Sequence, residues 1–318
     1  EFRYVFYDVL RVESHYRDLG RDDITAELID GVLEGCARFA EDVVAPTNEP
    51  GDRIGVRREE DGRVVTPPGF IKAYRQFVDD GWAALCGPAD AGGQGLPESF
   101  GGPVGEMLVS ANMSWKLYSG LTDSAVLCVA KHASEELRRI YLPKMVSGDW
   151  SGTMCLTESH AGTDLGIMRT RAEPDADGSF RISGTKIFIT SGEHDLTENI
   201  VHMVLAKLPD APAGSRGISL FLVPKYLPDA QGAPGAANGV SCASLEHKLG
   251  IHGSATCVMN FDNSRGWLIG EINGGLKCMF TMMNHARLWV GLQGLAQCEG
   301  AYQAALAYAR ERRQGRTS

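Results

Sequence analysis

The sequence has few features of a membrane protein or of a nucleic-acid-binding protein. No apolar run approaches the ~20 residues that a membrane-spanning helix needs, so we expect no membrane span. The formal net charge of -9 has the wrong sign for a surface that binds nucleic acid or an anionic membrane. A local basic site for one small anionic ligand is still compatible with this charge.

Several common catalytic motifs are absent as well. There is no G-x-G-x-x-G in a strand-turn-helix setting, no Walker loop, no H-E-x-x-H and no G-x-S-x-G. The eight histidines form no compact cluster, and His247 and His252 have no carboxylates arranged around them. We therefore expect neither a nicotinamide-type fold nor a P-loop fold, and no metal site.

The eight cysteines contain no C-x-x-C pair. They are scattered along the chain, and several stand in apolar runs such as "AVLCVA" around Cys128. This pattern is typical of reduced core thiols. It favours a cytoplasmic location over a disulfide framework or a zinc site.

What the sequence does contain is a change of pattern near residue 149. Before that point, apolar side chains recur at helical spacing, as with Ile24, Leu28 and Val32. After it, short runs rich in Val, Ile, Phe and Thr alternate with turn residues. We expect an α+β protein with an N-terminal helical domain (1–149), a central antiparallel β-barrel or sandwich (150–270) and the first helix of a C-terminal helical bundle (271–318).

The last segment reads as one long amphipathic helix that ends near Gly315. Its apolar face must pack against other elements, and the N-terminal helices would cover only part of that face. We therefore expect further chain after Ser318. The side chains of that face are Phe280, Leu288, Leu292, Leu295, Tyr302 and Leu306.

Two short stretches stand out for chemistry. "MCLTESHAGTD" (154–164) joins the end of an apolar strand to a glycine turn that carries the hydroxyls of Thr157 and Thr163. "KIFITSG" (186–192) is a strand that ends in an aromatic, an aliphatic and a hydroxyl side chain, which suits a flat heteroaromatic cofactor. Taken singly, each stretch is also explained by a core strand and a turn.

Together with other segments, these stretches resemble the acyl-CoA dehydrogenase family over nearly the whole chain. The matching segments follow the family's order and spacing; they are "AGGQGLP", "YLPKMVSGDWSGTMCLTESHAGTD", "ISGTKIFITSG", "GISLFLVPK", "LEHKLGIHGSATCVMNFD" and "YARERRQGR". The chain is most similar to the long-form bacterial members, which include the methylthiopropanoyl-CoA dehydrogenases. The resemblance implies FAD held between the β domain and a C-terminal four-helix bundle.

The resemblance assigns the first stretch to the flavin. Thr157 would hydrogen-bond the pyrimidine edge of the ring, with backbone help from Met154 and Leu156. Thr163 would reach the FAD pyrophosphate or the acyl-CoA, near a close backbone approach at Gly162.

The resemblance assigns the second stretch and the end of the last helix to the cofactor too. Phe188 would lie along the flavin ring beside Ile189, and Thr190 would hydrogen-bond N5, the atom that accepts hydride. Arg312 matches an arginine that reaches the FAD pyrophosphate of a neighbouring subunit, which implies a homodimer or a higher homo-oligomer. Taken alone, Arg312 is better explained as a basic helix C-terminus.

The substrate-binding candidates are Thr163, Asn284 and Arg287. Arg287 matches the family arginine near the CoA portion, and Asn284 stands where a polar residue that contacts the substrate is expected. An arginine fork suits phosphate oxygens. The alternative is that both residues belong to a solvated helix face.

The implied reaction is the FAD-dependent α,β-dehydrogenation of an acyl-CoA thioester to the trans-2-enoyl-CoA, in which a glutamate removes the α-proton. Some family members place this base immediately before the matched arginine, but this chain has Ala286 there. The other family position lies in the C-terminal bundle, so we expect the base beyond Ser318. Glu158 and Glu271 are poor substitutes because both belong to turns.

By the resemblance, electrons would pass to electron-transfer flavoprotein. An alternative from another class is a non-catalytic or repurposed structural partner that binds flavin and acyl-CoA. A glutamate in a helical bundle after Ser318 would distinguish the two. An acyl-CoA oxidase, which would react fast with oxygen, is a third possibility.

Overall fold

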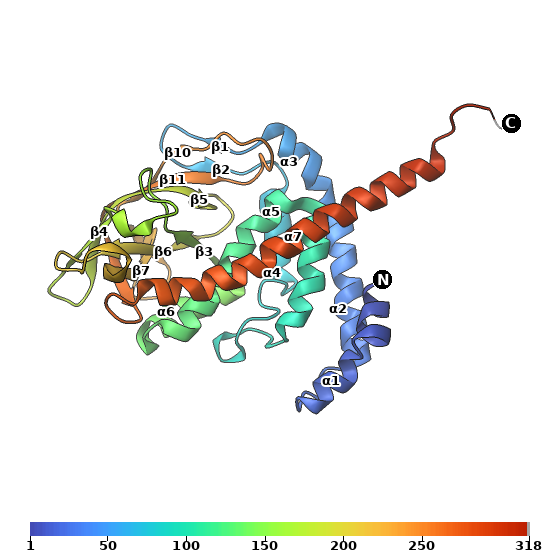
Figure 1. The fold of residues 1–318 in the computed structure, drawn as a ribbon, viewed down its shortest axis with the longest axis horizontal. Helices are drawn as coiled ribbons and strands as arrows, with labels where there is room; N and C mark the ends of the chain where they lie inside the picture. Colours follow the sequence, from blue (N-terminus) through green and yellow to red (C-terminus); the bar gives the residue numbers. More distant parts are fainter. Residues whose placement is uncertain (317–318) are drawn as a thin grey trace.

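The structure, a computed structural model, describes residues 1–316, so the last two positions of the expected C-terminal segment lie outside it (Figure 1). The N-terminal part is helical up to residue 147, apart from a small hairpin of β1 (Arg57–Arg58) and β2 (Val64–Val65). The helical elements are η1 (Tyr4–Val9), α1 (Val12–Asp18), α2 (Ala26–Phe39), η2 (Ala40–Val44), η3 (Ala45–Thr47), α3 (Asn48–Ile54), α4 (Phe70–Asp79), η4 (Ala89–Ala91), α5 (Glu98–His132) and α6 (Glu135–Ser147).

Helix α2 illustrates how the sequence sets these helices. Thr25 is its N-cap, and the side-chain oxygen accepts a hydrogen bond from Leu28 N at 3.2 Å. Ile29, Leu33 and Cys36 follow at three- and four-residue spacing and are buried on one face. The apolar spacing produced the helical expectation for this region, and the structure adds the cap at Thr25.

Helix α5 is the central helix and is broken in the middle. At Asn112 the backbone leaves the helical region (φ -160°, ψ 97°). The Asn112 side chain donates to Thr47 Oγ1 at 2.9 Å and accepts from Trp115 N at 3.0 Å, so it caps the second half of α5. Both halves of α5 are hydrogen-bonded to the last helix, α7 (Gly275–Glu311).

The β domain begins two residues after α6, beyond Gly148, which ends that helix in the left-handed conformation (φ 88°). Strands β6 and β7 are its core, buried at every position except Lys207. Its elements are β3 (Trp150–Cys155), η5 (Leu165–Ile167), β4 (Arg171–Pro174), β5 (Phe180–Thr190), β6 (Asn199–Lys207), η6 (Gly214–Gly217), β7 (Ile218–Pro224), β8 (Tyr226–Pro228), β9 (Pro234–Ala237), β10 (Val240–Leu245) and β11 (Thr256–Ile269).

Five strands of this domain pair in a closed circuit. β11 pairs with β5, β5 with β4, β4 with β6, β6 with β7, and β7 with the far end of β11. β10 adds to β11, and β3 adds to β6. The expected fold class is confirmed, with one correction: the sheet is mixed, because β3 and β4 run parallel to β6. β3 can do so because β4 and β5 lie between it and β6 in the chain and supply the crossover that a parallel pair needs.

Helix α7 is buried mainly in its first part, although Ala296 near its middle is buried as well. Cys278, Met279 and Met282 pack into the core, and the helix ends at Glu311, four residues before the expected end. Its C-terminal end projects beyond the N-terminal helices (Figure 1). Of the apolar face predicted from the sequence, Phe280, Leu288, Leu295 and Tyr302 are exposed, and Leu292 and Leu306 are half-buried.

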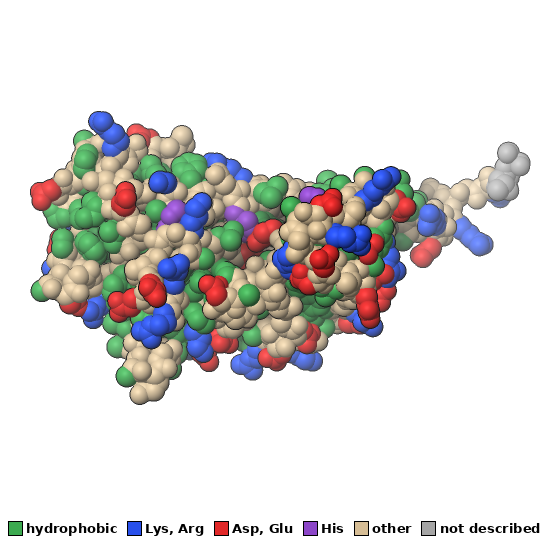
Figure 2. Space-filling model, turned by 90° about the horizontal axis from the view of Figure 1, so that it is seen from below, with side chains coloured by type: hydrophobic (Ala, Val, Ile, Leu, Met, Phe, Trp, Pro, Cys, Tyr) green, Lys and Arg blue, Asp and Glu red, His purple; other side chains and the backbone are tan. Residues whose placement is uncertain are grey.

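The surface carries charges of both signs. Lys and Arg side chains are interspersed with Asp and Glu over the face shown in Figure 2, with no large patch of one sign. Within residues 1–316, no helix combines the length and the apolar character that crossing a membrane would require.

Candidate cofactor and substrate site

The two stretches singled out in the sequence meet at the end of β3. Ile187 N donates to Thr157 O at 2.8 Å, and Lys186 Nζ donates to Leu156 O at 2.9 Å. Just beyond, Glu158 and Ala161 exchange two backbone hydrogen bonds, at 2.9 and 3.0 Å, and form a tight turn. Residues 154–163 and 186–190 therefore adjoin at residues 156–158 and 186–187, and the exposed parts of the two stretches together form the candidate surface, although about thirty residues separate them in the chain.

The Glu158 side chain closes the loop that follows. Its carboxylate accepts hydrogen bonds from Arg169 N at 2.7 Å, Thr170 N at 3.0 Å and Thr170 Oγ1 at 2.6 Å. It also accepts from Lys186 Nζ at 2.9 Å. Residues 158–170 thus form a loop whose first carboxylate is bonded to its last two residues.

Neither glutamate weighed in the sequence is placed as a base. Burial alone would raise the pKa of Glu158, but the charge of Lys186 and the hydrogen bonds from Thr170 and Arg169 lower it to about 2. A carboxylate held this way is a weak proton acceptor. Glu271 is exposed in the turn before α7.

Phe188 leaves the β5 ladder and faces solvent. Ile189 lies opposite Cys257 and Lys186 lies opposite Met259, so two residues of β5 oppose one of β11 in a β-bulge. Phe188 has φ 59°, and 59% of its surface is exposed. A bulky residue at positive φ is an outlier that points to function. The alternative that Phe188 is a core strand residue is wrong, because the bulge rotates it outward.

The hydroxyls expected at the cofactor are available. Thr157 and Thr190 are half-buried and Thr163 is exposed, and none of the three hydroxyls is hydrogen-bonded within residues 1–316. The neighbouring Thr153 and Thr170 hydroxyls, in contrast, contact His202 Nδ1 and Glu158. The first three hydroxyls can therefore bind a ligand without breaking contacts of the chain.

Gly162 and Ile189 have different places in this surface. A Cβ at Gly162 would meet only the Thr157 methyl group, at 3.7 Å, so no atom of the chain requires glycine there and its small size leaves room for a ligand. Ile189 is 2% exposed, so its side chain belongs to the core and only its backbone can contact a cofactor. Met154 and Leu156 are half-buried on the approach to Thr157.

The chemistry of this surface fits a flat heteroaromatic group. It offers an exposed aromatic ring, three hydroxyls and the backbone of two strand ends. No group of His, Cys, Asp and Glu that could hold a metal ion is found in residues 1–316. The residues present thus fit an organic cofactor with polar edges.

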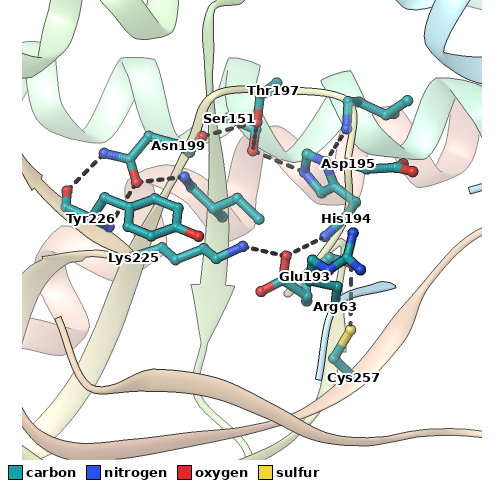
Figure 3. A network of polar contacts seen from close by, with 12 residues as sticks. Arg63, Ser151, Glu193, His194, Asp195, Thr197, Asn199, Lys225, Tyr226 and Cys257 are labelled. Carbon is teal, nitrogen blue, oxygen red and sulfur yellow. Dashed lines mark hydrogen bonds and ion pairs between the residues drawn. The ribbon is translucent and has the colours of Figure 1, made fainter. Parts of the chain in front are cut away.

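A buried polar network fixes the turn that follows Thr190 (Figure 3). Lys225 Nζ donates to Glu193 Oε1 at 2.6 Å, and the same oxygen accepts from His194 N at 3.0 Å. His194 Nε2 contacts Ser151 Oγ at 3.0 Å, which joins this turn to the start of β3. Burial, with a smaller effect of the Lys225 charge, lowers the pKa of His194 to about 3.

The substrate candidates on α7 are hydrogen-bonded to each other. Arg287 Nη1 donates to Asn284 Oδ1 at 3.1 Å, and the guanidinium lies 5.2 Å from the centre of the Phe280 ring. Both polar residues are exposed, and no hydrogen bond joins them to either stretch within residues 1–316. Arg312 lies just past the end of α7, over the Tyr308 ring at 5.8 Å, and at the end remote from the β domain (Figure 1).

A cavity of about 190 Å³ lies between α5, α7 and the segment 82–98. The Trp289 ring forms one wall, and its Nε1 donates to His285 Nε2 at 2.8 Å. Lys116 is buried in another wall, 3.4 Å from Asp123 and over the Trp289 ring at 5.8 Å. Burial raises the pKa of Asp123, against the opposing effect of Lys116.

Sequence reasoning missed both this cavity and the Lys186–Glu158 pair. Lys116 and Trp289 are 173 positions apart, so no local pattern connects them. A lysine inside the otherwise apolar strand "KIFIT" was the only signal for Lys186, since buried lysines are nearly always paired.

Two family models match the chain. The N-terminal domain of acyl-CoA dehydrogenase matches residues 30–149, and the middle domain of acyl-CoA dehydrogenase matches residues 153–264. The chain belongs to the acyl-CoA dehydrogenase family. The resemblance inferred from the sequence is thereby confirmed.

Within the acyl-CoA dehydrogenase family, the chain is 50% identical over 301 residues to 3-methylmercaptopropionyl-CoA dehydrogenase of Ruegeria pomeroyi, covering 95% of this chain and 50% of that protein. It is 37% identical to a butyryl-CoA dehydrogenase of Syntrophomonas wolfei, covering 98% and 52%. Among solved structures, it resembles one reported as an electron transferring flavoprotein of Acidaminococcus fermentans, with TM-score 0.75 and 26% identity over 92% of this chain and 70% of that one. The chain spans about half the length of the two curated relatives, the R. pomeroyi and S. wolfei enzymes.

Proposed function

We propose that the protein is an FAD-dependent acyl-CoA dehydrogenase that converts an acyl-CoA thioester to the trans-2-enoyl-CoA. The observation that carries this proposal is the meeting of residues 154–163 and 186–190 in one surface with an exposed ring and unengaged hydroxyls. FAD, when bound, supplies the acceptor for the β-hydride.

The residues of this surface would divide the binding of FAD among them. Phe188 would lie along the isoalloxazine ring, and Thr190 would hydrogen-bond its N5. Thr157, with the backbone of Met154 and Leu156, would hold the pyrimidine edge. Thr163, beside Gly162, would reach the pyrophosphate or the acyl-CoA.

Arg312 would act on a second copy of the chain. Its place past the end of α7, remote from the β domain, suits a contact with the FAD pyrophosphate of a neighbouring subunit (Figure 1). The proposed assembly is therefore a homodimer or a higher homo-oligomer. The scattered, mostly buried cysteines favour a cytoplasmic location.

The cavity beside Trp289 would take the end of the acyl chain. Ala286, where some family members carry the base, lies one turn before Trp289 on α7 and shares its side of the helix. A cavity of ~150 Å³ holds a benzene molecule, so about 190 Å³ admits a short acyl tail. The names of the two relatives, a methylmercaptopropionyl-CoA and a butyryl-CoA dehydrogenase, agree with that size.

On the CoA side, Arg287 and Asn284 would contact the substrate. The guanidinium fork of Arg287 suits phosphate oxygens. The base that takes the α-proton would be a glutamate after Ser318, outside the described residues. Electrons would leave through electron-transfer flavoprotein.

A second candidate is a flavin- and acyl-CoA-binding member without dehydrogenase activity. The observation that favours it is Ala286 at a base position, together with Glu158 held by four hydrogen bonds. An oxidase would share the site and differ in its reaction with oxygen.

Anaerobic mixing of the purified full-length protein with a panel of acyl-CoAs, followed by flavin absorbance, tests the proposal. Bleaching of the oxidised-flavin spectrum by short acyl-CoAs is expected. A bound flavin that no acyl-CoA reduces would support the second candidate. A protein that purifies without flavin and takes up none would contradict the cofactor site.

A further inference from the structure

Three consecutive residues of the first stretch are held by two consecutive residues of β5. Lys186 Nζ binds both Leu156 O and Glu158 Oε1, each at 2.9 Å. Between these two contacts, Thr157 O accepts from Ile187 N at 2.8 Å. Strand β5 therefore holds Thr157 at its own carbonyl and also holds the residue before it and the residue after it.

The pair that makes these contacts is closed to solvent. The Lys186 side chain is 0% exposed and that of Glu158 is 4% exposed. Glu158 also holds Arg169 N and both the N and the Oγ1 of Thr170, so the ammonium of Lys186 is connected to both ends of the loop 158–170. One buried lysine thus joins the strand that carries Phe188 to the loop that carries Thr163.

We propose that Lys186 and Glu158 are positioning residues. They set residues 156–157 and the loop 158–170 against the bulged end of β5 before FAD binds. This inference rests on the proposed function, since it assigns the surface to FAD. Neither side chain reaches that surface, so their effect on FAD would act through Thr157, Thr163 and Phe188.

A contribution to stability alone does not account for the pair. Apolar side chains of similar volume generally stabilise a core as well as or better than a buried ion pair does. The ion pair adds a directional constraint on the backbone, because the ammonium of Lys186 must contact a carbonyl and a carboxylate at the same time. The domain contains a second buried pair, Lys225–Glu193 at 2.6 Å, which contacts none of the residues 154–163 and serves as a matched control for the order of the loop 158–170.

The test compares the double variant Lys186→Met/Glu158→Gln with the control Lys225→Met/Glu193→Gln in the full-length protein. Each double variant removes one buried ion pair without leaving an unpaired charge, and each keeps an amide oxygen to accept from the backbone. We expect the Lys186/Glu158 variant to bind FAD at least tenfold more weakly and to alter the flavin absorption bands. The control reports only on the order of the loop 158–170, because its pair lies in the turn that follows Thr190.

Hydrogen exchange of the flavin-free protein gives a readout that does not depend on FAD. The amides of Ile187, Arg169 and Thr170 are expected to exchange at least tenfold faster in the Lys186/Glu158 variant and to be unchanged in the control. Equal FAD affinity in this variant and the unchanged protein, or equal loosening in both double variants, would overturn the inference. If the unchanged protein binds no FAD, the proposed function fails, while the exchange rates still decide whether the pair orders the loop.

Discussion

A Cβ placed on Gly105 of α5 would lie 1.9 Å from Cζ3 of Trp289 on α7. The indole ring therefore occupies the space that any other residue at position 105 would need. This contact sets how closely the two helices approach, and it places the ring in the wall of the cavity. Glycine, usually unfavourable in a helix interior, is required here by packing.

Gly105→Ala is expected to destabilise the protein, because the methyl group forces Trp289 or the helix to move. Overpacking of this kind costs about 1–3 kcal/mol in free energy of unfolding. Gly102→Ala is the control, since a Cβ there meets nothing within 4 Å and alanine favours a helix. Urea unfolding of both variants measures the difference; equal stability of the two would show that α7 is not seated on Gly105.

Trp289→Leu is expected to lengthen the cavity and shift the substrate preference toward longer acyl groups. Each additional buried methylene contributes roughly 0.8 kcal/mol, so two further carbons correspond to a change of about tenfold in the ratio of kcat/KM values. Lys277→Ala is the control, because Lys277 is exposed on the same helix. An unchanged ratio in Trp289→Leu would place the acyl chain elsewhere.

Phe188→Gly is expected to separate backbone strain from cofactor binding. A non-glycine residue at φ 59° costs roughly 1–2 kcal/mol, and glycine removes that cost. Phe188→Ala loses the same ring and keeps the strain, so Phe188→Gly should unfold with a free energy about 1 kcal/mol higher than Phe188→Ala. Both should bind FAD more weakly than the unchanged protein; full FAD affinity in both would remove the ring from the flavin site.

Thr190→Val is expected to slow reduction of the flavin by at least tenfold, because the hydrogen bond to N5 is lost while the shape of the side chain is kept. Stopped-flow absorbance under anaerobic conditions measures the rate. Thr185→Val is the matched control on the same strand, where the hydroxyl donates to Asn260 Oδ1 at 2.8 Å on the exposed side. Reduction at the original rate in Thr190→Val would assign the N5 contact to another group.

Stability is expected to fall as the pH decreases below 6.5. Burial, aided by the Lys225 charge, lowers the pKa values of His194 and His202 to about 3, so both are neutral when folded and take up protons on unfolding. Their contribution is complete above pH 6.5 and is lost as the pH falls toward 3. At pH 5 each histidine should reduce the free energy of unfolding by about 2 kcal/mol relative to pH 7.5.

His202→Leu tests this pH dependence. It should make the loss of stability between pH 7.5 and pH 5 smaller by about 2 kcal/mol in urea unfolding, whatever its effect on stability at pH 7.5. A variant with the same pH dependence as the unchanged protein would show that His202 is charged or accessible in the folded state.

Much of the fold was predictable because local signals were strong. Apolar side chains at helical spacing mark α2, and most positions of the runs that became β6 and β7 are apolar. The mixed pairing of the sheet was not predictable, because strand direction depends on which strands become neighbours. The bulge at Phe188 was missed for the same reason, since it exists only through the register of β5 against β11.

The sequence by itself determined the order of helices and strands, because hydrophobic spacing and turn residues act over a few positions. Its resemblance to the family assigned the two stretches to the candidate flavin site. Only the tertiary structure decided that Lys186 binds Glu158, that Phe188 faces outward and that Trp289 fills the space beside Gly105. Lys186 and Glu158 are 28 positions apart in the chain, and Trp289 and Gly105 are 184 apart. The orientation of Phe188 depends on the pairing of β5 with β11, which is also distant in the chain. Burial and close packing, which select among such contacts, are properties of the assembled core rather than of any segment.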